Sequence, residues 1–246
     1  MSALEDDWKR HLDWEGCFNV RDLGGLATKT GRRTRQGRLV RADSLEGLTP
    51  AGWSALSAHG VRTVIDLREP DEIGNDASPR PASVRTIHLP LDGSEHREFW
   101  EIWGAGPQFA TPLYYGPHLE RFPERSAAVI SAIARADPGG VVYHCGGGRD
   151  RTGQITMLVL ALVGVSAEDI AADYALSIER VRALYAARGR RDDGPLLDAF
   201  WTARGTTASE VITTTLAELD VETRLVEAGV TREDLVALRQ RLLDPR

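Results

Sequence analysis

The feature that most constrains this chain is a segment of strand, loop and helix character around its second cysteine. Residues 141–145 (VVYHC) have the β-branched composition of a buried strand. From 152 to 163 the chain is apolar almost all round, which predicts a helix buried in the core. Between them stand Gly146, Gly147 and Gly148, which let the backbone curl without side-chain clashes. The sequence therefore predicts a strand, a tight glycine loop and a buried helix in succession.

The same segment carries the residue types that a phosphoryl group requires. A curled glycine loop points its N–H groups at an anion, and a helix beginning near Thr152 adds its positive end. This field favours the thiolate of Cys145, which is the nucleophilic form. A tight loop returns Arg151 to the side of the sulfur, where its guanidinium can hold two phosphoryl oxygens. Thr152 can donate to the thiolate, and His144 can fix the loop through backbone contacts.

The segment predicts a phosphatase that uses Cys145 as its nucleophile and Arg151 as its transition-state clamp. One alternative is a glycine-rich turn with a buried cysteine, and another is a catalytically silent phosphate-binding module. A zinc site is disfavoured because no second Cys or His pair has ligand spacing nearby. We predict no metal and no cofactor. The predicted phosphate-binding residues are Gly146, Gly147, Gly148, Arg149, Asp150, Arg151 and Thr152.

The rest of the chain indicates an α/β protein with a helical C-terminal half. Residues 1–37 are expected to be irregular, and everything after 166 is expected to be helical, with capping-box spacing at Ser166, Thr207 and Thr231. This order of elements favours a mostly parallel central sheet flanked by helices, in a single domain over 1–246. Further strands are predicted at 39–42, 61–67 and 84–89, and further helices at 50–59 and 118–135.

Bulk properties narrow the class of protein. The net charge of -6 argues against a general nucleic-acid binder. There is no run of 18 apolar residues and no apolar signal core, so neither a membrane span nor a classical signal is expected. Two cysteines do not make a disulfide framework, and Cys17 has the character of a buried small hydrophobe. We expect a cytoplasmic protein; unconventional secretion leaves no mark in a sequence, and neither does oligomeric state.

The segment HCGGGRDRTG (144–153) resembles the signature loop of the protein tyrosine phosphatase superfamily. More narrowly, it is similar to the bacterial tyrosine and lipid phosphatases, the group of mycobacterial protein tyrosine phosphatase B. The resemblance covers nearly the whole chain and implies an α/β phosphatase domain, a cysteinyl-phosphate intermediate, no metal, and a mobile lid over the pocket. Its other similar segments, in order, are FNVRDLGG, LVRADSL, GVRTVIDLRE, IHLPLD, ERFPERSAAVISAI, ADYALS and GVTREDLVALRQRLL.

Several acidic residues are candidates for a role at this site. Dephosphorylation needs an acid that protonates the leaving oxygen. Asp92 stands where the resembling family places its acid, with an aspartate in a surface turn as its other interpretation. Asp150 is the second candidate, with loop bracing beside a neighbouring arginine as its other interpretation. Arg21 and Asp22, in FNVRDLGG, are predicted near the phosphate, where they brace the loop or contact substrate. Glu72 is expected in an internal ion-pair network with Asp66 and Arg68.

The substrate class remains open at this point. The resembling family usually has Lys where this chain has Arg149, so a planar fork replaces a point charge. We expect a phosphoprotein or phospholipid substrate: phosphotyrosine, with phosphoserine, phosphothreonine or a phosphoinositide as further candidates. Residues 92–117 mix Gly, Pro and aromatic residues, and either pack a small core of their own or form a lid over the site.

Overall fold

A mixed sheet carries the fold. The structure is a computed structural model, and it describes residues 10–73 and 80–245. Within these residues the sheet has five strands in the order β1-β2-β5-β3-β4. Only the β1–β2 pair is antiparallel; the other three pairs are parallel. The strands are β1 (Arg21–Asp22), β2 (Leu39–Ala42), β3 (Val61–Asp66), β4 (Arg85–His88) and β5 (Gly140–His144).

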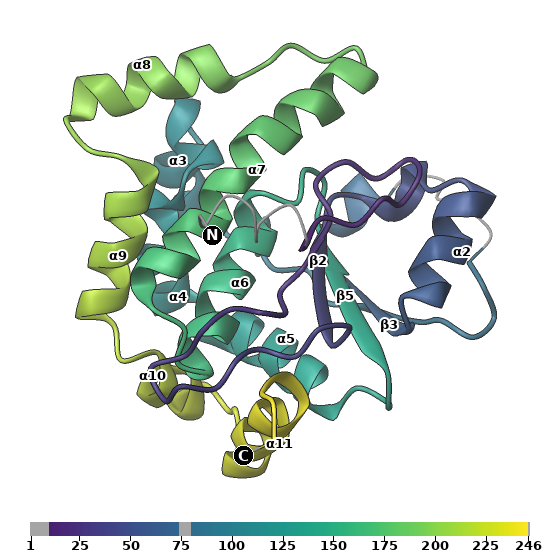
Figure 1. Ribbon diagram of the computed structural model, residues 1–246. Coiled ribbons are helices and arrows are strands. Elements are labelled where there is room, and N and C mark those ends of the chain that lie inside the picture. Colours follow the sequence, from purple (N-terminus) through teal and green to yellow (C-terminus); the bar gives the residue numbers. More distant parts are fainter. Residues whose placement is uncertain (1–9, 74–79, 246) are drawn as a thin grey trace.

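Helices cover both faces of the sheet, with α2 on one face and the longer helices on the other (Figure 1). The α-helices are α2 (Pro50–Ala58), α3 (Arg97–Trp103), α4 (Tyr115–Arg121), α5 (Pro123–Arg135), α6 (Asp150–Leu162), α7 (Ala167–Ala187), α8 (Gly194–Arg204), α9 (Ala208–Glu218), α10 (Val221–Glu227) and α11 (Arg232–Leu242). The 3₁₀ turns are η1 (Leu45–Gly47), η2 (Pro70–Glu72), η3 (Gly106–Ala110) and η4 (Pro112–Tyr114).

The strands are apolar on both sides because both faces are covered. Along β5, Val141 and Tyr143 join the core formed with α5 and α6, whereas Val142 joins the core beneath α2. On the neighbouring β3, Val64 joins the core beneath α2, and Ile65 joins the core formed with α5 and α6. Because β5 lies in the middle of the sheet, the loop that follows it opens at the carboxyl edge, where parallel sheets place their sites.

The predicted fold class is confirmed: a mostly parallel sheet flanked by helices, with a helical C-terminal half from α7 to α11. The predicted caps are present, because the side chains of Ser166, Thr207 and Thr231 each accept a hydrogen bond from the backbone three residues later. The predicted strands end within one residue of the observed ones. No helix in the described ranges is long and apolar enough to cross a bilayer.

Two local predictions were wrong. Residues 1–37 were expected to be irregular, yet Arg21–Asp22 pairs with β2 as a short edge strand. The helix predicted over 118–135 is two helices, α4 and α5. The chain leaves helical geometry at Phe122, with φ -134° and ψ 50°, because Pro123 disfavours the helical conformation for the residue before it. Pro123 then begins α5, where its missing N–H costs nothing.

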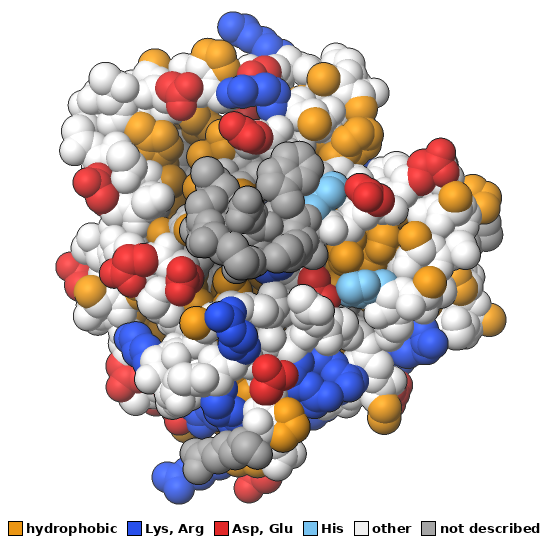
Figure 2. Space-filling model, viewed as in Figure 1, with side chains coloured by type: hydrophobic (Ala, Val, Ile, Leu, Met, Phe, Trp, Pro, Cys, Tyr) orange, Lys and Arg blue, Asp and Glu red, His pale blue; other side chains and the backbone are white. Residues whose placement is uncertain are grey.

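The segment 92–117 forms α3, η3, η4 and the beginning of α4. It packs an aromatic core of its own, in which the Phe99 ring lies 5.0 Å from Trp100 and 5.1 Å from Phe122, measured between ring centroids. Tyr114 and Tyr115 are buried in the main core. Opening and closing of this segment as a lid stays a prediction. On the face of the molecule in Figure 2, acidic and basic side chains are both scattered over the surface.

Candidate active site

The glycine loop connects the end of β5 to the first turn of α6. Each of its carbonyls is bound on the outer side: Gly146 accepts from Ser44 N at 3.1 Å, Gly147 from Asn19 Nδ2 at 3.0 Å, and Gly148 from Arg41 Nη2 at 2.8 Å. In a trans peptide the N–H points away from the C=O. The N–H groups of the next residues therefore face the concave side, as an anion site requires.

Gly148 is required for this curl. Its φ is 66°, in the region that favours glycine. A Cβ at this position would also lie 2.6 Å from the carbonyl oxygen of Ala42 and the backbone nitrogen of Asp43. The loop thus packs directly against the end of β2, and any larger residue would push it out of place.

Cys145 lies at the start of the loop. It is buried, with 3% of its surface exposed, and its Sγ accepts a hydrogen bond from Thr152 Oγ1 at 3.2 Å. Thr152 belongs to the first turn of α6, so the sulfur faces the positive end of that helix. The ring of His144 contacts the carbonyl oxygen of Cys145 through Nδ1 at 3.3 Å. The predicted contacts of Thr152 and His144 are therefore both present.

Arg151 is held by carboxylates in this structure. Both oxygens of Glu72 pair with its guanidinium, Oε1 lying 2.7 Å from Nη2. Oδ2 of Asp92 lies 3.3 Å from Nη1. The expected network of Asp66 and Arg68 is present, with Arg68 Nη2 2.7 Å from Asp66 Oδ2, but Glu72 forms its ion pair with Arg151 instead. Sequence reasoning missed Glu72 as a site residue because η2 comes far from the glycine loop along the chain.

Asp92 is a buried carboxyl group with one unused oxygen. Only 7% of the residue is exposed, and Oδ1 has no hydrogen-bond partner among the described residues. Burial raises the pKa of Asp92 to about 7; Arg151 opposes the rise, and the nearby Glu69 and Glu72 add to it. Asp92 is therefore partly protonated near neutral pH, as a general acid must be.

The backbone around Asp92 is fixed by three side chains. Glu69 accepts from the backbone nitrogen of Asp92 at 3.0 Å. Trp100 Nε1 and His118 Nε2 both bind its carbonyl oxygen, at 3.2 and 3.3 Å. Burial lowers the pKa of His118 to about 4, so its ring is neutral and Nε2 carries the donated proton. Sequence reasoning missed the roles of Glu69, Trp100 and His118, although Glu69 ends the similar segment GVRTVIDLRE and Trp100 lies in the segment 92–117.

Asp150 lies beside Arg149, as its bracing interpretation expected. Arg149 Nε is 3.4 Å from both Asp150 oxygens. The two Nη atoms of Arg149 bind the carboxylate of Asp193, at the start of α8, at 3.1 and 2.8 Å. Arg149 is only 4% exposed. Its predicted contact with phosphate has no support in this geometry.

The position predicted for Asp22 was wrong. Its carboxylate accepts hydrogen bonds from the backbone of Gly24 and Gly37, and it pairs with His59 Nε2 at 2.8 Å. Asp22 lies opposite Val40, toward the start of β2 and away from the glycine loop. The motif around Asp22 folds locally, and sequence alone cannot say which end of β2 it braces.

The residue beside Asp22 belongs to a charge cluster behind the loop. Arg21, together with Arg10 and Arg41, binds the buried carboxylate of Asp173 on α7, and Arg41 also holds Gly148. Burial opposes the charge on Asp173, but the three guanidinium groups hold its pKa far below its ordinary value. This cluster fixes α7 against the loop.

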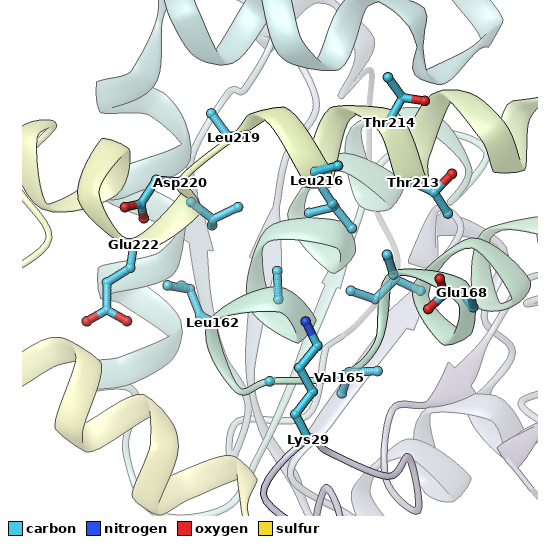
Figure 3. Close-up of a pocket in the computed structure, with 16 residues that line it drawn as sticks. Lys29, Leu162, Val165, Glu168, Thr213, Thr214, Leu216, Leu219, Asp220 and Glu222 are labelled. Carbon is cyan, nitrogen blue, oxygen red and sulfur yellow. The ribbon is translucent and has the colours of Figure 1, made fainter.

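A pocket of about 450 Å³ opens beside Arg151. Its walls include Glu69, Asp71, Glu72, Asp92, Trp100 and Phe109. A larger cavity, of about 730 Å³, lies at the far end of α6 among Lys29, Glu168 and Leu216, and Figure 3 shows these side chains around it. No residue of the glycine loop lines that cavity, so the smaller pocket is the one next to the chemistry.

A central parallel strand that runs into a cysteine–arginine anion loop defines a protein tyrosine phosphatase type of hydrolase. The family model described as "Tyrosine phosphatase family" matches residues 12–244. A protein of Cupriavidus necator named as a tyrosine-protein phosphatase is 32% identical over 73% of this chain and 67% of its own. The triple specificity protein phosphatase PtpB of Mycobacterium tuberculosis is 30% identical over 92% of this chain and 86% of its own. The chain belongs to the tyrosine phosphatase family.

Among solved structures, P. aeruginosa TpbA in complex with phosphotyrosine is 14% identical, with a TM-score of 0.42, over 81% of this chain and 91% of that chain.

Proposed function

We propose that residues 1–246 form one phosphatase domain that hydrolyses phosphotyrosine through a cysteinyl-phosphate intermediate on Cys145. The observation that carries this proposal is the juxtaposition of three groups at the carboxyl edge of the sheet. They are the buried sulfur of Cys145 at the start of the anion loop, the guanidinium of Arg151, and the Asp92 carboxyl 3.3 Å from that guanidinium. This arrangement supports the assignment of Cys145 as nucleophile, Arg151 as clamp and Asp92 as acid.

In the first step, the Cys145 thiolate forms a bond to phosphorus while the bond to the tyrosyl oxygen breaks. Asp92 gives its proton to that leaving oxygen, and the loop N–H groups and Arg151 hold the equatorial oxygens. Glu72 takes one N–H of each Nη atom of Arg151, so the other N–H groups, on Nε and Nη2, can hold the phosphoryl oxygens. Glu72 then keeps the guanidinium oriented during the reaction.

In the second step, water attacks the phosphorus and the bond to sulfur breaks. Asp92, now a carboxylate, takes a proton from the attacking water, and inorganic phosphate leaves. Thr152 stabilises the departing thiolate, because its hydroxyl donates to Sγ across 3.2 Å. The same hydrogen bond stabilises the thiolate before attack, so it lowers the barrier chiefly by making the sulfur a better leaving group.

The relatives, the pocket and the cysteines support further proposals about the substrate range, the lid and the cell compartment. A relative is named a triple specificity protein phosphatase, which supports testing phosphoserine, phosphothreonine and phosphoinositides beside phosphotyrosine. We propose that 92–117 acts as a lid, because Trp100, Gly104 and Phe109 from this segment line the pocket at Arg151. The two free cysteines are consistent with action in the reducing cytoplasm.

Cys145→Ser tests the covalent mechanism. The variant should lose turnover of an aryl phosphate while it still binds inorganic phosphate or vanadate, because the loop and Arg151 supply most of the anion affinity. In wild-type enzyme, rapid acid quenching during turnover of a ³²P-labelled phosphotyrosine peptide should trap phosphate on Cys145, located by peptide mapping. Turnover that survives the Cys145→Ser substitution would exclude the covalent mechanism.

A further inference from the structure

We propose that the pocket beside Arg151 is a subsite for a cationic side chain next to the phosphotyrosine. The enzyme would then prefer peptides in which Lys or Arg flanks the phosphotyrosine over peptides flanked by Asp or Glu, and over phosphoinositides. This inference rests on the proposed function, because it assumes that the phosphoryl group binds in the glycine loop. It adds a charge preference to the proposed phosphotyrosine activity.

The pocket carries an excess of negative charge. Three carboxylates line it, those of Glu69, Asp71 and Glu72, against the guanidinium of Arg151 as the one cation among its described lining residues; Asp92, which acts as the protonated acid, adds no charge when substrate binds. Glu69 is satisfied by neutral donors, the backbone of Asp92 and Gly93 and the hydroxyl of Ser94, which leave its charge in place. Binding of a phosphoryl dianion to Arg151 raises the negative charge further. A cation on the substrate would offset it.

The place of Asp92 indicates where the rest of the substrate lies. Asp92 lines the pocket, and its Oδ2 lies 3.3 Å from Arg151 Nη1. In the proposed mechanism the carboxyl group of Asp92 meets the tyrosyl oxygen. The ring attached to that oxygen and the residues on either side of it therefore enter the space between the carboxylates.

Aromatic side chains form another wall of the same pocket. Trp100 and Phe109 both line it, with ring centroids 5.7 Å apart in an edge-to-face arrangement. The Trp100 indole is fixed because Nε1 donates to the carbonyl oxygens of Asp92 and Gly93. Aromatic faces beside carboxylates suit both a tyrosyl ring and an ammonium or guanidinium group. They offer nothing to a second phosphate.

The other cation of the loop is not available to a polyanion. Arg149 is 4% exposed, and its nitrogens are bound to the carboxylates of Asp150 and Asp193. A phosphoinositide with additional phosphates would therefore meet the acidic pocket beside Arg151, and Arg149, already paired with carboxylates, would not offset the repulsion. The exposed connector between α7 and α8 contains Arg190, whose guanidinium is stacked on Tyr185 at 4.7 Å. If that connector binds the additional phosphates of the substrate, the enzyme will prefer phosphoinositides to Lys-flanked phosphotyrosine peptides.

The test compares phosphotyrosine peptides that differ only at the two flanking positions, with Lys, Ala or Glu there, and a short-chain phosphatidylinositol 3-phosphate. For wild-type enzyme we expect kcat/KM to be about tenfold higher for the Lys peptide than for the Glu peptide, since an attraction replaces a repulsion. The ratio should shrink between 50 and 300 mM salt. Turnover of the phosphoinositide should be slower than that of the Lys peptide.

Asp71 provides the variant, because it is exposed at the rim and can change charge without leaving a buried gap. Asp71→Lys should lower the Lys-to-Glu ratio at least about threefold, and Asp71→Asn should lower it less. Glu227→Lys is the matched control: Glu227 is exposed at the end of α10, does not line the pocket, and should leave the ratio unchanged. This pair separates a local charge effect from a change in net charge.

The inference is overturned if wild-type enzyme hydrolyses the Lys and Glu peptides equally well, if it prefers the Glu peptide or the phosphoinositide, or if Asp71→Lys leaves the ratio unchanged. Failure of the proposed function looks different. In that case no peptide is turned over, or turnover of every peptide survives Cys145→Ser.

Discussion

Replacement of Asp92 by Asn tests the general acid most directly. An amide cannot protonate the leaving oxygen, and a general acid contributes about a hundredfold or more to a rate. Hydrolysis of phosphotyrosine, whose leaving oxygen is strongly basic, should therefore slow by roughly a hundredfold. Hydrolysis of p-nitrophenyl phosphate should slow by less than about tenfold, because p-nitrophenolate leaves unaided. The wild-type rate should fall as pH rises through about 7, where Asp92 loses its proton, and the variant should lack this fall.

The same substitution should change stability with pH, in a direction fixed by the raised pKa. Burial raises the pKa of Asp92 from 3.8 to about 7, so the folded protein holds this proton more tightly than the unfolded chain does. The contribution of this proton to the free energy of unfolding is fully present below pH 3.8 and is lost as the pH rises through 7. The full loss is on the order of 4 kcal/mol, and roughly 3 kcal/mol of it falls between pH 5 and 8. An Asn side chain does not titrate, so the variant does not lose this stability as the pH rises.

Urea denaturation of wild-type protein and Asp92→Asn at pH 5 and pH 8 measures this effect. Between pH 5 and pH 8, the free energy of unfolding of the variant should rise by roughly 3 kcal/mol relative to that of wild type.

Asp150→Asn is the matched control for the kinetic assay. Because Asp150 is interpreted as a loop brace, this variant should slow hydrolysis of phosphotyrosine and of p-nitrophenyl phosphate to the same extent. If leaving-group dependence follows Asp150 instead, or if the stability difference does not change with pH, the reasoning about Asp92 is refuted.

Two further substitutions test the clamp and the charge cluster behind the loop. Arg151→Lys should lower kcat at least about a hundredfold, because an ammonium cannot make the two-point grip; a loss below about threefold in steady-state assays would make the arginine a structural brace. Asp173→Asn should lower the free energy of unfolding by about 3–5 kcal/mol, since it leaves buried guanidinium groups uncompensated. The exposed Asp198→Asn should change it by less than about 0.5 kcal/mol in the same urea titration, and equal effects would contradict the account.

The elements around the glycine loop could be predicted from sequence because each is determined locally. A β-branched run, three glycines and a helix that is apolar all round leave few other structures for 141–163. The same holds for the C-terminal helices, whose caps at Ser166 and Thr231 are encoded within four residues. Sequence also predicted the proximity of Asp92, though only through resemblance to a family. Local pattern and family pattern thus predicted the residues that we propose as nucleophile, clamp and acid.

Contacts between segments that lie far apart along the chain could not be predicted from the sequence. Glu72 and Arg151 are 79 positions apart, and Arg41 and Asp173 are 132 apart. A charged side chain carries no local sign of its partner, so Glu72 was assigned to the wrong network and Asp22 to the wrong end of β2. The break at Phe122 was a different failure. The Pro123 signal was present, but a single helix was predicted across it.

Arg149 illustrates how one substitution within a loop pattern changes the charge that a substrate meets. The resembling family usually has Lys here, whose ammonium makes point contacts on a flexible stem. The planar guanidinium of Arg149 instead binds both oxygens of Asp193 and reaches Asp150 as well. The positive charge is kept, but it is paired with Asp193 and holds the start of α8 against the loop. With that charge neutralised, the substrate meets Arg151 and the acidic pocket beside it, and this is why a cation beside the phosphotyrosine should improve binding.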